Sequence, residues 1–307
     1  MEIKQIHKAF SGIFLFLVFV LLAFFARIFA GIPLHEYRIW SVFAMQVGIA
    51  VLLVLISYEF QIIRKKTFLP AILFMLFTAS NPVLYDNSKA TISALAMVVC
   101  LIISFKNYHN LHSQSGSFNI ALILTAGNVL CCRPLLYFIP LFWIGFWWFR
   151  SFNVRAFFAS LLGICTVYLF LISWCVFSND WSYLFDVLPP FKEIIPVDWI
   201  VLEWYNWAVV AFFVLLLILS AIDIFITGFS EKIRTTLFFK FLYLLTIVLF
   251  IFICFFDSSV NNIQTIIYFS IAFISGFYFA MNEDKKLVTF LLIFTVLFFI
   301  TSYIFRQ

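Results

Sequence analysis

Long runs of apolar residues, separated by short polar interruptions, dominate the pattern along this chain. The first run, residues 9–26, contains no charge and is long enough to cross a bilayer as a helix. A secretory signal has a shorter apolar core of about 7–15 residues, so we expect this helix to remain uncleaved. Taken together, the runs predict eleven helices, at about residues 9–26, 39–60, 68–79, 90–105, 120–131, 134–149, 156–177, 200–229, 241–256, 263–281 and 287–305.

Composition places these helices in a membrane. Hydrophobic residues make up 65% of the 307 positions and charged residues only 11%, whereas a soluble domain carries about 25% charge. Barrel strands would alternate apolar and polar residues with a period of two, which the unbroken runs do not. The prediction is an all-α integral membrane protein with a single polytopic domain over residues 1–307: helices one to seven within 1–177, an outer interfacial segment at 178–199, and helices eight to eleven within 200–307.

The basic residues predict the orientation of the chain. With the amino terminus in the cytoplasm and the carboxy terminus outside, 13 of the 19 Lys and Arg residues fall on the inner side, as the positive-inside rule requires. The net charge of +5 therefore reflects topology, and we expect membrane lipids rather than nucleic acid as partners. The exceptions fall on or near the outer side: Arg27, Arg38, Lys89, Arg133, Lys192 and Arg306.

The first three outer connections carry the candidate chemistry. The first has Arg27 near its helix end, then His35, Glu36 and Arg38; the second has Asp86 and Lys89; the third has Arg133. Arg and Lys bind phosphate through charge-assisted hydrogen bonds, and a carboxylate beside them can act as a general base. We therefore predict Glu36 and Asp86 as catalytic residues, with His35 as an acid–base helper. The predicted phosphate ligands are Arg27, Arg38, Lys89 and Arg133.

A structural interpretation of the same residues stays open. Glu36 with Arg38, and Asp86 with Lys89, can be ion pairs at the membrane rim, and Arg27 can extend to lipid headgroups. The segment 178–199 can be a lid over the outer pocket or an anchoring loop, since it alternates aromatic and acidic residues. No metal is predicted, because His109 and His112 have no third ligand nearby and the six cysteines show no metal-binding spacing.

Two resemblances arise at these residues. The stretch from Asn81-Pro82 through Arg133-Pro134 to Phe149-Arg150-Ser-Phe-Asn153-Val-Arg155 resembles a family of bacterial inner-membrane proteins of similar length, which implies no activity. The wider layout resembles the C-type-fold glycosyltransferases, which take a sugar from a lipid phosphate. That resemblance implies an acid at Glu36, a supporting acid at Asp86 and phosphate ligands at Arg27 and Arg133. The first outer connection is shorter here and carries one Glu.

The leading functional hypothesis is a multi-pass protein of the bacterial inner membrane that resembles a glycosyltransferase. Its donor would be a polyprenyl-phosphate-linked sugar at the outer face, and no other cofactor is predicted. The alternative is a non-enzymatic subunit or scaffold of an envelope export or assembly complex. A third hypothesis, a lipid or small-solute transporter, is disfavoured because Gly and Pro gather near the rims rather than at mid-membrane.

Overall fold

The described part of the chain is built from helices alone. The computed structural model describes residues 12–30, 36–60, 62, 67–110, 112–131, 133–181, 204–227, 233–255, 260–282 and 286–306, and these contain no strand. The α-helices are α2 (Ile13–Phe29), α3 (Tyr37–Glu59), α4 (Leu69–Ala79), α5 (Ser88–Lys106), α6 (Gln114–Leu130), α7 (Ile139–Trp148), α8 (Val154–Ser178), α10 (Trp204–Thr227), α11 (Ile233–Phe255), α12 (Val260–Met281) and α13 (Lys286–Arg306). Two 3₁₀ helices, η1 (Pro82–Leu84) and η2 (Arg133–Phe138), lie between them.

Six of the described helices each contain a stretch that is long and apolar enough to cross a membrane: α3, α5, α8, α10, α11 and α12. A helix rises 1.5 Å per residue, so about 20 residues span the hydrocarbon core. Four further apolar segments, in α2, α4, η2–α7 and α13, are 10–17 residues long. The prediction of an all-α, multi-pass membrane protein is therefore confirmed.

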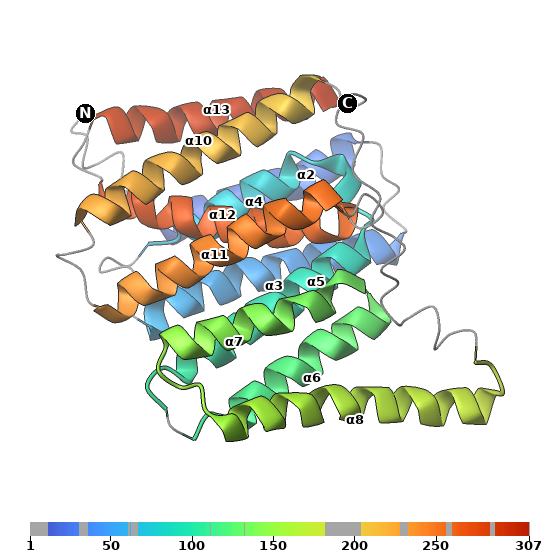
Figure 1. Ribbon diagram of the computed structural model, residues 1–307. Helices are drawn as coiled ribbons and strands as arrows, with labels where there is room; N and C mark the ends of the chain where they lie inside the picture. The colour runs from blue at the N-terminus through green and yellow to red at the C-terminus, as the bar shows by residue number, and fades with distance from the viewer. Residues whose placement is uncertain are drawn as a thin grey trace.

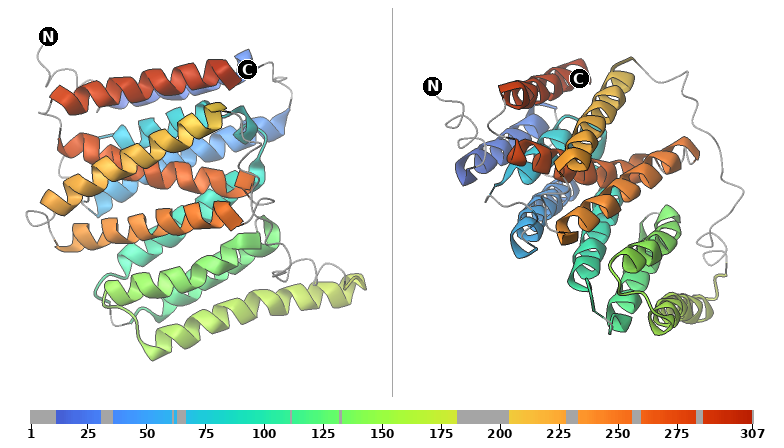
Figure 2. Two further views of the ribbon diagram at one scale, coloured as in Figure 1. Left: turned by 45° about the horizontal axis from the view of Figure 1, so that its top comes forward. Right: turned by 60° about the vertical axis from the view of Figure 1, so that its left-hand side comes forward.

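The helices run side by side in a layered bundle, with the α6–α8 pair at one edge and α10 with α13 at the other (Figure 1). Helix α12 lies among the other helices in both views of Figure 2. Its apolar window is 94% buried, whereas that of α8 is only 22% buried. The core therefore forms around α12, against which α4, α5, α10 and α11 pack.

Glycines allow two pairs of helices to approach closely. A Cβ on Gly276 of α12 would lie 2.7–2.8 Å from Pro70 Cγ, Cα and N on α4. A Cβ on Gly163 of α8 would lie 2.6 Å from the backbone oxygen of Phe118 on α6. Small residues let membrane helices approach closely and gain dispersion contacts, which drive association where lipid removes the hydrophobic term. Both helix pairs therefore depend on the missing side chain.

Helix boundaries differ from the sequence-based ranges where polar residues are helical. Residues 114–119 and 233–240 belong to α6 and α11, although their polarity predicted connections. In α6, Ser117 Oγ donates to the Ala156 carbonyl at 2.7 Å, and Ser113, which precedes the helix, donates to the Ser151 carbonyl. Because the Ser151 and Ala156 carbonyls accept hydrogen bonds from these hydroxyls, the polar residues can be part of the helix.

The Asn81-Pro82 break occurs as predicted and positions the segment that follows it. Helix α4 ends at Ala79, and η1 begins at Pro82, whose ring cannot continue an α-helix. The Tyr85 hydroxyl donates to the Ala79 carbonyl, and the Gln46 side chain donates to the Leu84 carbonyl at 3.4 Å. These bonds hold the turn between α4 and α5 against α3.

Candidate functional site

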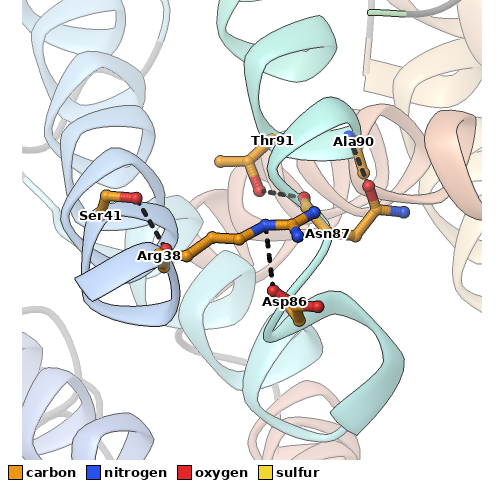
Figure 3. A network of polar contacts seen from close by, with 6 residues as sticks. All are labelled: Arg38, Ser41, Asp86, Asn87, Ala90 and Thr91. Carbon is orange, nitrogen blue, oxygen red and sulfur yellow. Dashed lines mark hydrogen bonds and ion pairs between the residues drawn. The ribbon is translucent and has the colours of Figure 1, made fainter. Parts of the chain in front are cut away.

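An exposed ion pair joins two of the predicted connections. Arg38, in the first turn of α3, places Nε 3.2 Å from Asp86 Oδ1 in the loop between η1 and α5 (Figure 3). Their side chains are 58% and 63% exposed. Arg38 pairs with Asp86, in place of the alternative pairings of Arg38 with Glu36 and Asp86 with Lys89. The structure thus brings together one predicted phosphate ligand and one predicted catalytic acid.

The loop that carries Asp86 is held by the start of α5. Asn87 Oδ1 accepts from the Ala90 backbone N–H at 3.0 Å, which is an N-cap hydrogen bond. The Asn87 carbonyl accepts from Thr91 Oγ1 at 3.2 Å (Figure 3). Asp86 is therefore presented from a capped helix start, adjacent to a fixed asparagine.

Arg27, in the last turn of α2, lies wholly inside the protein. Its side chain is 0% exposed; Nη1 donates to the Ala23 carbonyl at 2.8 Å and Nη2 donates to Gln46 Oε1 at 2.5 Å. The guanidinium lies over the rings of Phe43 and Tyr85, each 4.5 Å from the ring centroid. Arg27 Nε has no hydrogen-bond partner, and among the described residues no carboxylate pairs with Arg27.

This arrangement makes Arg27 a support for the ion pair. Tyr85, whose ring contacts the guanidinium, directly precedes Asp86, and Gln46 connects Arg27 to the Leu84 carbonyl. Burial raises the pKa of Tyr85, an effect that nearby Arg27 opposes, so its hydroxyl stays protonated and continues to donate to Ala79. The Arg27 side chain is buried and does not extend to the lipid headgroups. Direct contact between Arg27 and a phosphate stays a prediction.

Of the remaining predicted residues, Glu36 and Lys89 are described with their side chains, and within the described part of the chain neither forms an ion pair with Arg38 or Asp86. Glu36 is exposed and immediately precedes α3, and Lys89 is exposed on the first turn of α5. The backbone of Arg133 begins η2. The Arg133 side chain, His35 and most of segment 178–199 lie outside the described residues.

A second group of polar residues, absent from the sequence-based prediction, lies at the start of α12 and contacts Asn87, the residue after Asp86. Asn87 Nδ2 donates to the Asn261 carbonyl at 3.2 Å and to Asn262 Oδ1 at 3.3 Å. About two turns further along α12, the Tyr268 hydroxyl accepts from Gln264 Nε2 at 2.9 Å and from Asn81 Nδ2 at 3.2 Å. The available signal was the four polar residues at 261, 262, 264 and 265, at the start of an otherwise apolar helix.

The opposite end of the bundle carries a comparable ion pair that serves as a reference. Lys106 Nζ lies 3.3 Å from Glu59 Oε1, and their side chains are 56% and 53% exposed. Arg234 lies near the rings of Phe60, Tyr108 and Phe238 at the same end, at 5.2–5.6 Å from the centroids. Substitutions in the Lys106–Glu59 pair therefore serve as controls. An effect seen only for the Arg38–Asp86 pair depends on its position, and an effect seen for both pairs is common to exposed ion pairs.

The chemistry available at the Arg38 end is anion binding next to a carboxylate. Among the described residues, no group of three metal-ligating side chains converges. Comparisons with protein-family models, curated proteins and solved structures found no match to this chain. The functional inference therefore depends on the site itself.

Proposed function

We propose that this chain is a glycosyltransferase-like protein of the bacterial inner membrane that takes a sugar from a polyprenyl phosphate at the outer face. One observation carries the proposal: an exposed cation and an exposed carboxylate, from two separate connections, lie 3.2 Å apart at the end of a membrane bundle. Exposed pairs contribute only about 0–1 kcal/mol, so a phosphate can displace Asp86 from Arg38 at little cost. The pair is thus suited to exchange partners.

The proposed reaction uses both members of the pair. Arg38 holds the lipid phosphate through charge-assisted hydrogen bonds, which leaves the Asp86 carboxylate free. Asp86 takes the proton of an acceptor hydroxyl as that oxygen bonds to the sugar's anomeric carbon. The bond between this carbon and the phosphate oxygen breaks, and the lipid phosphate leaves with the electron pair, stabilised by Arg38. Glu36, exposed at the same rim, provides a second carboxylate, and Arg27 with Tyr85 supports the loop.

The proposal requires that the Arg38 end faces outward, with eleven spans and a cytoplasmic amino terminus. A cysteine-free variant carrying Glu36→Cys should react with a membrane-impermeant maleimide in intact cells. The corresponding His112→Cys variant, at the exposed Lys106 end, should react only after permeabilisation. The reverse pattern would place the Arg38 end in the cytoplasm and contradict the proposal.

The enzymatic proposal is tested by surface-glycan mass spectrometry in cells that depend on this gene. Arg38→Ala and Asp86→Asn should each remove most of a glycan that wild type restores. The matched variants Lys106→Ala and Glu59→Gln change an equally exposed pair and should restore it fully. Wild-type glycans from both Arg38→Ala and Asp86→Asn, at normal protein levels, would exclude this reaction.

A second candidate, a non-enzymatic subunit of an envelope complex, is favoured by α8. Its window is the least buried of the six candidate spans, at 22%, and it exposes Phe170, Trp174 and Phe177. This function predicts that Trp174→Ala with Phe177→Ala abolishes the phenotype while Asp86→Asn does not. The glycosyltransferase proposal predicts the opposite result.

A further inference from the structure

A buried threonine on α12 lacks the hydrogen bond that comparable threonines make. Thr265 is 0% exposed, and its Oγ1 has no hydrogen-bond partner among the residues that the structure describes. Four equally buried helical threonines each donate to the carbonyl four residues earlier, at 2.7–3.0 Å: Thr78, Thr125, Thr246 and Thr295. The corresponding carbonyl for Thr265 belongs to Asn261 and instead accepts from Asn87 Nδ2. A buried hydroxyl without a partner is unfavourable, particularly in a membrane protein.

Further unused hydrogen-bonding capacity lies on the same side of α12. Asn261, Thr265 and Tyr268 follow the spacing that puts residues on one helix face. Tyr268 accepts two N–H donors, and among the described residues no acceptor is found for its own hydrogen. Asn262 uses its amide oxygen and Gln264 its amide nitrogen. No partner is found in the described part of the chain for the Asn262 amide nitrogen or the Gln264 amide oxygen.

These polar groups run along α12 from its exposed start toward its buried middle, and this row of groups is called the path below. Asn261 is exposed, Asn262 and Gln264 are half-buried, and Thr265 and Tyr268 are buried. The helix rises about 10 Å over these residues. Asn87 joins the rim end of the path to the loop of Asp86, its neighbour in the chain. Arg38 and the start of α12 therefore both contact the short loop formed by Asp86 and Asn87.

We propose that the face of α12 that carries Thr265 and Tyr268, with Asn262 and Gln264 on either side of it, is a subsite for a neutral, hydroxyl-rich group, namely the sugar of the lipid-linked donor. The proposal rests on the proposed function, because it assigns the phosphate of the same donor to Arg38. Amides and hydroxyls, without a charged residue among the four, complement sugar hydroxyls that both donate and accept. The sugar would supply the partner that Thr265 lacks.

Two properties of Thr265→Val separate a ligand site from a packing feature. Valine keeps the shape but removes the unpartnered hydroxyl, so the melting temperature should stay the same or rise by about 2–4 °C. Thr246→Val, which removes a satisfied hydroxyl at equal burial, should leave the melting temperature unchanged or lower it. A fall for Thr265→Val larger than that for Thr246→Val would overturn the proposal, since the hydroxyl would then have a structural partner.

Binding is measured on the full chain in nanodiscs, with polyprenyl phosphate alone and with the same lipid bearing glucose, galactose, mannose or N-acetylglucosamine. Wild type should bind at least one sugar-bearing lipid about tenfold more tightly than the bare lipid, as expected for one or two added hydrogen bonds. Thr265→Val and Gln264→Leu should each reduce this preference to below about threefold, with bare-lipid affinity unchanged. Thr246→Val should keep it.

The outcomes distinguish the subsite from the proposed function. Equal affinity for bare and all four sugar-bearing lipids, or a preference that survives both α12 variants, would overturn the subsite alone. Failure of wild type to bind any of these lipids would overturn the proposed function and the subsite together. Loss of bare-lipid binding in Arg38→Ala, with the sugar preference removed only by the α12 variants, would support both.

Discussion

Gln46→Leu tests how much the buried charge of Arg27 depends on Gln46, its one side-chain hydrogen-bond acceptor among the described residues. Both side chains are 0% exposed, so the guanidinium has no water to replace Gln46 Oε1. A hydrogen bond to a charged group contributes about 1.5–3 kcal/mol. The Ala23 carbonyl and the rings of Phe43 and Tyr85 remain in the variant. We therefore expect a loss of about 2 kcal/mol in the free energy of unfolding, roughly a 30-fold change in the folding equilibrium.

The assay is reversible unfolding by SDS in mixed micelles, supported by thermal melts in detergent. Gln46→Glu is the informative companion, because it keeps an acceptor and adds a charge opposite to that of Arg27. It should be at least about 1 kcal/mol more stable than Gln46→Leu. A Gln46→Leu variant as stable as wild type, or a Gln46→Glu variant no more stable than Gln46→Leu, would refute the described role of Gln46.

Two further predictions concern packing and surface charge. Gly276→Ala should lower the free energy of unfolding by about 1–3 kcal/mol, because its Cβ would meet the Pro70 backbone at 2.8 Å. Gly48→Ala, which meets nothing within 4 Å, should be neutral or stabilise by up to about 1 kcal/mol; equal effects in SDS unfolding would contradict the close α4–α12 contact. Glu59→Gln should change stability by less than about 1 kcal/mol, since its partner Lys106 is exposed; a larger loss would show that the pair is coupled to the core.

The class of fold followed from the sequence because bilayer solvent imposes a simple rule. Uncharged apolar runs of sufficient length form helices, and the predicted helices at 39–60, 68–79 and 156–177 agree with α3, α4 and α8 within two residues at each end. Polar helix starts such as Ser113–Ser117 were assigned to connections, since their hydrogen-bond partners, the Ser151 and Ala156 carbonyls, are distant in sequence. Local polarity does not reveal such partners.

The candidate site was predicted only in outline. Arg38 and Asp86 were both identified as exceptions to the charge bias, but their mutual pairing depends on how α3 packs beside α5. Arg27 was expected near the end of its helix, below the rim, with its charge either extended to lipid headgroups or held by a partner, because a charge in hydrocarbon is unfavourable. The structure encloses it with Gln46, the only polar side chain in residues 42–56, and with two aromatic rings. The α12 group could not be connected to Asp86 without the contact through Asn87.

The central claim is that Arg38 and Asp86 form a lipid-phosphate site, and polyprenyl-phosphate binding to the full chain in nanodiscs tests it most directly. Loss of one charge-assisted contact of about 1.5–3 kcal/mol predicts that Arg38→Ala weakens binding roughly 10- to 100-fold. Asp86→Asn should bind as well as wild type or better, because it frees Arg38, and Lys106→Ala should match wild type. Equal affinities for wild type, Arg38→Ala and Lys106→Ala would contradict the claim.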